Sequence, residues 1–124
     1  MSIIIVDDEA AVRSCLHDLL QANGHDVISV GSCDEALRIL KDRVCTVALV
    51  DYHMGPPDGL ETLRRPRAAH PSCAGILMTG SLDASEIAKA AQCDEIARVL
   101  VKPFPGDELQ RAIEEARAKD AATT

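Results

Sequence analysis

Carboxylate, hydroxyl and ammonium groups recur at one kind of place in this sequence, the end of a short apolar run. Asp7 and Asp8 follow the first run, Asp51 closes the third, and Thr79 and Lys102 stand at the ends of the last two. Two adjacent carboxylates about 5 Å apart repel each other by about 3 kcal/mol at an effective dielectric near 20. A cation bound among the three acids would relieve that repulsion.

Together these residue types suit phosphoryl transfer. Mg²⁺ prefers a few carboxylates, several waters and a phosphate oxygen over a cage made only of protein ligands. Lys102 and Thr79 add donors for the other oxygens of a phosphoryl group, and an aspartate can act as the nucleophile. A simpler interpretation of Asp7 and Asp8 is a helix N-cap and a solvated acid at a strand-to-helix turn.

The elements that must position these groups alternate regularly along the chain. Apolar runs, several rich in β-branched residues, predict strands over 2–6, 26–30, 46–51, 74–80 and 97–102. Helical spacing of apolar residues and capping signals predict helices over 9–21, from a capping box at 32–35, and over 58–65, 83–92 and 106–119. Pro66 should stop or kink the third helix.

Five strand–helix pairs in strict alternation predict an α/β domain, a doubly wound parallel sheet with right-handed crossovers and helices on both faces. Sites in such sheets lie at the carboxyl ends of the strands, so the acids, Thr79 and Lys102 should converge on one edge. We expect one domain over residues 1–119 and a disordered tail over 120–124.

Composition excludes several classes of function. The net charge of −7 argues against nonspecific binding of nucleic acid and against anionic membrane surfaces. The start of the chain lacks the features of a signal peptide and no apolar run is long enough to span a membrane, so we expect a cytoplasmic protein. Five scattered cysteines without a C-x-x-C motif favour reduced thiols over disulfides or zinc.

The chain resembles the receiver domains of two-component response regulators, such as chemotaxis regulators, over essentially its whole length. The resemblance is carried by "IIIVDDE", by "ALVDYHM" followed by "PDGLE", by "ILMTG" and by "VLVKPF", in the expected order. It implies a flavodoxin-like (βα)5 fold with strand order 2-1-3-4-5.

The resemblance also implies a role for each matching residue. Asp51 would be the phosphoacceptor and a ligand of Mg²⁺. Asp8 would bind the ion directly, Asp7 mainly through water, and His53 through its backbone carbonyl. The phosphoryl group would come from a histidine kinase or a phosphotransfer protein. The domain would be no enzyme beyond Mg²⁺-dependent self-phosphorylation and slow self-dephosphorylation.

Two further residues complete the set that the resemblance implies. Lys102 would pair with the phosphoryl oxygens, and the Lys102–Pro103 bond is often cis in the family. The Thr79 hydroxyl would turn to the phosphoryl group and so change a face that a partner reads. The aromatic residue usual three positions before the lysine is replaced by Val99, so this movement would be transmitted differently.

Other functions remain open from the residues alone. A pseudo-receiver would serve as an interaction scaffold whatever its phosphorylation. A phosphatase with an aspartate nucleophile usually has a second acid where His53 stands, and a flavin-binding electron carrier needs a Ser/Thr-rich loop after the first strand, where this chain has "DDEAA". Too few residues follow 119 for an output domain, so we expect a stand-alone receiver or a part of a longer regulator or hybrid kinase, acting on a downstream protein or an attached output domain.

Overall fold

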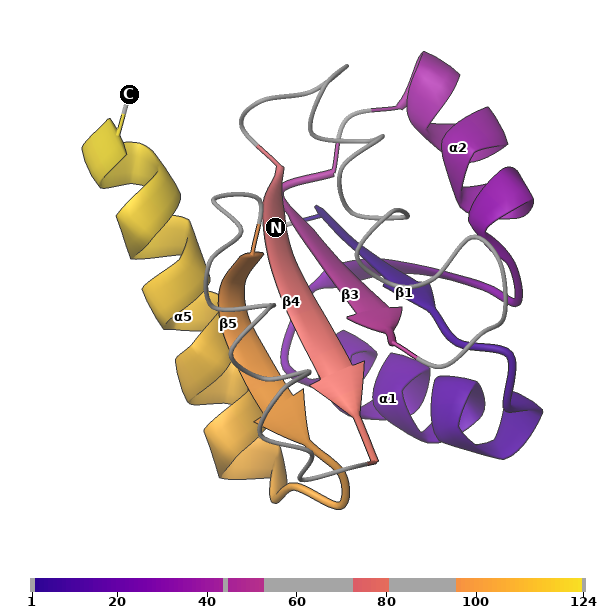
Figure 1. Cartoon of the computed structure of the whole chain (residues 1–124), viewed down its shortest axis with the longest axis horizontal. Coiled ribbons are helices and arrows are strands. Elements are labelled where there is room, and N and C mark those ends of the chain that lie inside the picture. The colour runs from indigo at the N-terminus through magenta and orange to yellow at the C-terminus, as the bar shows by residue number, and fades with distance from the viewer. Residues whose placement is uncertain (1, 44, 53–72, 81–95, 124) are drawn as a thin grey trace.

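A parallel sheet forms the centre of the molecule, as predicted. The computed structural model describes residues 2–43, 45–52, 73–80 and 96–123. Its strands are β1 (Ser2–Val6), β2 (Asp26–Val30), β3 (Val47–Asp51), β4 (Ala74–Thr79) and β5 (Ile96–Val101), and its helices are α1 (Ala10–Ala22), α2 (Cys33–Asp42) and α5 (Gly106–Thr123). The strand order is β2-β1-β3-β4-β5 with every neighbouring pair parallel, which confirms the flavodoxin-like topology. Figure 1 shows β1, β3, β4 and β5 side by side.

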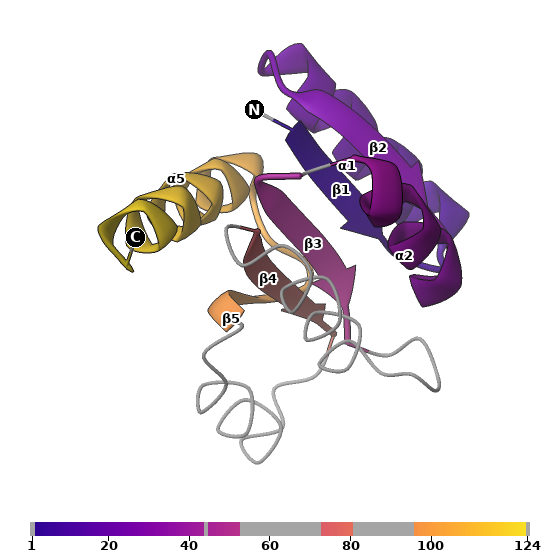
Figure 2. The same ribbon diagram turned by 90° about the horizontal axis from the view of Figure 1, so that it is seen from above.

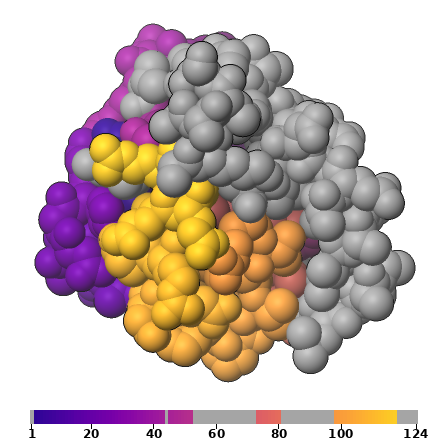
Figure 3. All heavy atoms as spheres, turned by 90° about the vertical axis from the view of Figure 1, so that its left-hand side faces the viewer, coloured from indigo at the N-terminus to yellow at the C-terminus, as the bar shows by residue number. Residues whose placement is uncertain are grey.

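The middle strands of the sheet are covered by helices on both sides, so both faces of the sheet carry apolar residues. All residues of β3 and β4 are buried. One face packs against α1 and α5 through Leu16, Leu20, Leu109 and Ile113. The other face packs against α2 through Ala36 and Leu40. Figure 2 shows the twisted sheet with β2 and β5 at its two edges, and Figure 3 shows the outer surface of α5 beside β5.

The turns follow from local chemistry. Glu9 is the N-cap of α1, and Asn23 ends the helix. Gly24 then takes a φ of +88°, a left-handed conformation that costs glycine little because it has no Cβ. At the start of α2 the Ser32 hydroxyl accepts a hydrogen bond from the Glu35 backbone N–H at 3.2 Å, which confirms this part of the predicted capping box.

The end of the chain differs from the expectation. Helix α5 continues to Thr123, so it includes most of the expected tail at 120–124. Ala121 and Ala122 favour this extension, since alanine has the highest helix propensity. The helices predicted over 58–65 and 83–92 lie outside the described residues, as does Pro66. Among the residues that the structure does describe, no helix is both long and apolar enough to cross a membrane.

Candidate functional site

The carboxyl ends of the strands bring the predicted residues together at one edge of the sheet. Asp51 and Thr79 are the last residues of β3 and β4, whereas Asp7 and Lys102 come directly after β1 and β5. The backbone ladder extends one residue further at both of these points. The Asp7 N–H donates to the Val30 carbonyl at 3.2 Å, and the Lys102 N–H donates to the Thr79 carbonyl at 2.7 Å. Regular sheet geometry therefore fixes the backbone that carries these side chains.

Three carboxylates form the acidic cluster, Asp7, Asp8 and Asp51. Each offers an oxygen, and these oxygens all lie within 4.8 Å of one another. Asp7 is 0 % exposed and Asp51 is 4 % exposed, whereas Asp8 is open to solvent. Charges at that separation repel by about 3 kcal/mol per pair at an effective dielectric of 20. The arrangement is therefore stable only with positive charge close by.

Lys102 supplies part of that positive charge. Its Nζ lies 2.9 Å from Asp7 Oδ2 and 3.5 Å from Asp51 Oδ2. Partial burial disfavours the charged ammonium, but the hydrogen bond to Asp7 and the charges of Asp51, Asp7 and Glu9 outweigh this effect. The net result raises the pKa of Lys102 above its ordinary value. Lys102 is therefore charged at neutral pH and binds the acids from one side.

Asp7 serves both the turn and the site. Its Oδ1 accepts a hydrogen bond from the Glu9 backbone N–H at 2.9 Å, while its Oδ2 faces Lys102. The backbone carbonyl of Asp7 accepts a hydrogen bond from Arg13 Nη1 at 2.7 Å. The simpler interpretation of Asp7 as the helix N-cap is wrong, because Glu9 is the N-cap of α1. One carboxylate oxygen of Asp7 stabilises the turn before the helix, and the other belongs to the charged cluster.

Sequence reasoning missed Arg13. A basic residue within the first turns of an amphipathic helix is usually a solvated surface residue, and nothing in its spacing indicates that it reaches back to the turn before the helix. The hydrogen bond from Arg13 to the Asp7 carbonyl depends on the direction that the Arg13 side chain takes over the turn before α1, and this direction is set by tertiary packing.

The remaining predicted residues are placed only in part. Thr79 is 2 % exposed on the neighbouring strand, one residue beyond Met78, which pairs with Asp51. The Lys102–Pro103 peptide is cis, as the resemblance implied. Val99 is partly buried against the α2 face of the sheet, where it joins an aliphatic and cysteine-containing core cluster. His53 lies outside the described residues.

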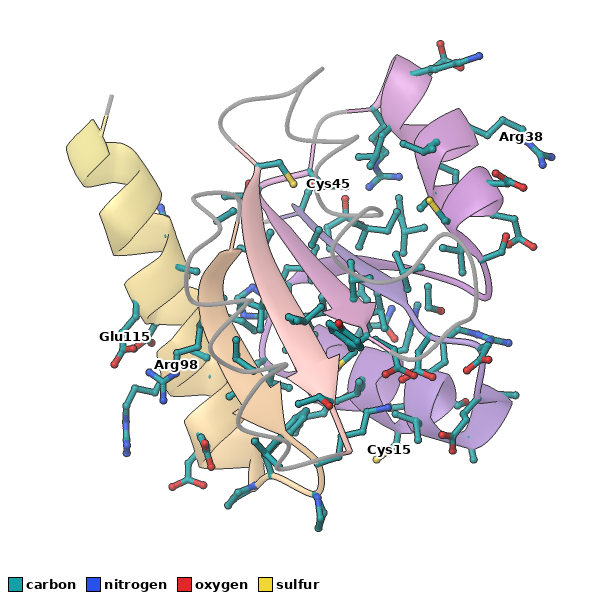
Figure 4. The ribbon with its side chains drawn as sticks, viewed as in Figure 1. Cys15, Arg38, Cys45, Arg98 and Glu115 are labelled. Atoms are coloured by element: carbon teal, nitrogen blue, oxygen red, sulfur yellow. The ribbon has the colours of Figure 1, made fainter. Side chains whose placement is uncertain are left out.

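A mainly apolar hollow of about 360 Å³ opens next to the charged groups. It lies between the first half of α1 and the segment that follows β5. The lining residues are Ala11, Val12, Cys15, Leu16, Lys102, Pro103 and Phe104. Cys15 is exposed there, near the carboxyl ends of the strands (Figure 4). The charged edge of the sheet is therefore bordered by an apolar surface.

The acidic cluster fits a Mg²⁺ ion by the chemistry of its donors. All three groups are hard carboxylate oxygens, and the spacing of their oxygens allows them to share one ion. The exposure of Asp8 leaves room for the waters that Mg²⁺ retains. Soft ligands are not part of the cluster, so a thiol-bound metal such as zinc does not match it.

Comparison with known proteins agrees with this geometry. The sequence pattern of the response regulator receiver domain matches residues 3–114. The transcriptional regulatory protein ZraR of Klebsiella oxytoca is 32% identical over 121 residues, covering 95% of this chain and 26% of that protein. A protein-glutamate methylesterase/protein-glutamine glutaminase of Hahella chejuensis is 33% identical over 106 residues, covering 85% of this chain and 30% of that protein. The chain thus spans less than a third of either relative.

Solved structures agree in the same way. A response regulator receiver domain from Clostridium thermocellum has a TM-score of 0.88 at 26% identity, covering 99% of this chain and 98% of that one. The signal receiver domain of an HD domain-containing protein from Pseudomonas fluorescens Pf-5 has a TM-score of 0.88 at 30% identity, covering 98% and 97%. The chain belongs to the response regulator receiver domain family of two-component signalling proteins.

Proposed function

We propose that this receiver domain accepts a phosphoryl group on Asp51 from the phosphohistidine of a histidine kinase or a phosphotransfer protein. The observation that carries the proposal is the position of Asp51. It is 4 % exposed at the end of β3, in the acidic cluster, with the Lys102 ammonium 3.5 Å from its Oδ2. Receiver domains are generally signalling domains and not enzymes, so the modified Asp51 is itself the product.

The residues around Asp51 divide the chemical work. A carboxylate oxygen of Asp51 forms the new bond to phosphorus as the bond between phosphorus and the donor nitrogen breaks, and the donor imidazole leaves. Lys102 neutralises phosphoryl oxygens, since its raised pKa keeps it charged. Asp7, Asp8 and Asp51 would hold Mg²⁺, with the His53 carbonyl as a further ligand. When bound, the ion supplies charge neutralisation to the phosphoryl oxygens.

The response to phosphorylation is proposed to be a population shift. Phosphorylation replaces the single negative charge of the Asp51 carboxylate by a phosphoryl group with about two, so about one negative charge is added at the end of β3. Thr79 is buried at the end of the neighbouring strand β4, and its backbone carbonyl already accepts the Lys102 N–H. A movement of Thr79 toward the phosphoryl group would therefore also shift the start of the segment after β5. A partner that prefers this arrangement would read the signal.

The output is proposed to lie in a separate protein or an attached domain. The relatives named above are a transcriptional regulatory protein and a methylesterase, and this chain covers less than a third of each. A receiver domain can therefore serve different outputs within the family.

The direct test is incubation with acetyl phosphate, with and without Mg²⁺, followed by intact mass measurement. We expect a gain of one phosphoryl group that needs Mg²⁺, is released by hydroxylamine as an acyl phosphate is, and disappears in Asp51→Asn. Asp18→Asn is the matched control, since Asp18 is an exposed carboxylate on α1. Labelling that survives in Asp51→Asn, or no labelling when an active receiver is labelled in parallel, would refute the proposal.

A further inference from the structure

Arg13 joins the two turns that flank the acidic cluster. From α1 its Nη1 donates to the Asp7 backbone carbonyl at 2.7 Å. The same guanidinium lies over Gly31, the residue that follows β2. A Cβ placed on Gly31 would lie 3.1 Å from Nη1 and 3.7 Å from Cζ. Gly31 therefore leaves the space that the guanidinium occupies.

This contact completes the anchoring of one peptide unit. The Asp7 N–H is already bound to the Val30 carbonyl at 3.2 Å. The Asp7 carbonyl belongs to the planar peptide that joins Asp7 to Asp8, so its direction fixes the positions of the Asp8 backbone N and Cα, from which the Asp8 side chain leaves. Asp8 is exposed, and among the described residues the hydrogen bonds of this turn reach the Asp7 carboxylate and carbonyl and not the Asp8 side chain. Arg13 is thus the group placed to hold this peptide in one orientation.

We propose that Arg13 is a positioning residue for the acidic cluster, with Gly31 as the cradle of its guanidinium. Arg13 holds the peptide between Asp7 and Asp8 so that the three carboxylates face one point. The part of this inference that concerns the cation rests on the proposed function. The part that concerns the order of the turn does not.

The sign of one measurement separates positioning from simple electrostatics. A cationic side chain near the acids repels Mg²⁺, so removal of its charge alone would tighten cation binding. Removal of a positioning contact would instead weaken binding, because the carboxylates would lose their common orientation. Outer contacts of this kind typically change metal affinity by 10-fold or more.

The first experiment is a Mg²⁺ titration of the full chain, followed by the fluorescence of Tyr52, the sole tyrosine, which adjoins Asp51. We expect Arg13→Met to weaken Mg²⁺ binding about tenfold, and Arg13→Lys to recover part of the loss. The matched control is Arg38→Met, because Arg38 is exposed on α2 and points away from the sheet (Figure 4). Unchanged or tighter binding in Arg13→Met would overturn the proposal.

Gly31→Ala tests the cradle. The added Cβ should push the guanidinium away by a few tenths of an ångström, which lengthens its hydrogen bond to the Asp7 carbonyl and should weaken Mg²⁺ binding in the native background. In the Arg13→Met background the same substitution should have little further effect, because no guanidinium remains to be displaced. Equal and additive losses in the two backgrounds would show that Gly31 acts independently of Arg13.

The second experiment uses the metal-free protein and needs no cation. Hydrogen exchange of the Glu9 amide reports the order of the turn, since this N–H donates to Asp7 Oδ1. Arg13→Met should accelerate that exchange about tenfold. The Glu35 amide, which donates to Ser32 Oγ at the start of α2, should be unaffected.

The two experiments fail in distinguishable ways. If the native chain binds no Mg²⁺, the proposed cation site is refuted, and the exchange of the Glu9 amide alone decides the role of Arg13. If Glu9 exchange is the same in the native chain and in Arg13→Met, Arg13 does not order the turn and the inference fails, whatever the Mg²⁺ affinity.

Discussion

The Nζ of Lys102 lies 2.9 Å from Oδ2 of Asp7, a residue 95 positions earlier in the chain. Asp7 follows β1 and Lys102 follows β5, and β3 and β4 lie between these two strands in the sheet. The Lys102 side chain therefore reaches past the end of β3, where its Nζ also lies 3.5 Å from Asp51 Oδ2. Asp7 is 0 % exposed and the side chain of Lys102 is 19 % exposed. This ion pair is therefore largely shielded from solvent, and it links the first and last strands of the domain.

Replacing Lys102 should destabilise the metal-free protein. Lys102→Met leaves the buried carboxylate of Asp7 without its cation, beside two other acids. We expect a loss of about 1–3 kcal/mol in the free energy of unfolding, less than for a fully buried pair because Lys102 is partly exposed. Urea unfolding measures it. Lys41→Met, on the exposed side of α2, is the matched control.

Mg²⁺ should recover part of that loss, because the ion restores positive charge to the same acids. A Lys102→Met chain that is as stable as the native one without Mg²⁺ would contradict the importance of the pair. Equal losses in Lys102→Met and Lys41→Met would do so as well.

Mg²⁺ should stabilise the native chain. A ligand that binds only the folded state at ten times its dissociation constant raises the free energy of unfolding by about 1.4 kcal/mol. Asp8→Asn should remove most of this gain, and in the metal-free state it should not destabilise the chain, because it relieves repulsion at an exposed position. Urea unfolding with and without MgCl₂ measures the gain, with Asp18→Asn as control. Equal stabilisation of both variants would place the ion elsewhere.

Alkaline pH should destabilise the fold through Cys45. Burial raises the pKa of the Cys45 thiol; Asp26 adds to this, and Arg43 opposes it. Above the ordinary thiol pKa of about 8.5 the unfolded chain loses this proton while the folded chain keeps it. The free energy of unfolding therefore falls as the pH rises from the ordinary thiol pKa to the raised pKa of Cys45 in the folded chain, by at most about 1.4 kcal/mol per pH unit.

Urea unfolding between pH 8 and pH 10 tests this linkage. Cys45→Ala should show a shallower fall than the native chain, although its stability at pH 8 will be lower because Cys45 is 0 % exposed. Cys15→Ala, at an exposed thiol, should keep the native slope. The same slope in all three chains would rule out Cys45 as the source.

The start of α2 depends on Ser32. Ser32→Ala removes the acceptor of the Glu35 N–H and should lower the free energy of unfolding by about 1 kcal/mol. Ser14→Ala is the matched control, since Ser14 is exposed in the interior of α1 and alanine favours a helix there. Thermal unfolding of both variants checks the prediction, and it fails if Ser14→Ala costs as much as Ser32→Ala.

The sequence by itself determined the sheet and the edge at which the site lies. Runs such as "SIIIV" and "TVALVD" are apolar at every position except their ends, as strands covered on both faces must be. The first forms β1, and the second forms β3 from Val47 onward. Alternation with helices made the sheet parallel, and parallel strands end at a common edge. The positions of Asp7, Asp51, Thr79 and Lys102 along the chain were therefore sufficient to predict that they meet.

Only the tertiary structure decided how these groups are paired. Lys102 binds Asp7 more closely than Asp51, and Asp7 divides its two oxygens between Lys102 and the Glu9 N–H. Arg13 reaches the Asp7 carbonyl over Gly31, from a position that looked like helix surface. The backbone positions of these residues follow from the hydrogen-bonded ladders of the sheet, and the pattern of apolar residues along the chain predicts those ladders. The direction of a long side chain depends instead on packing between segments far apart in sequence, which no local pattern records.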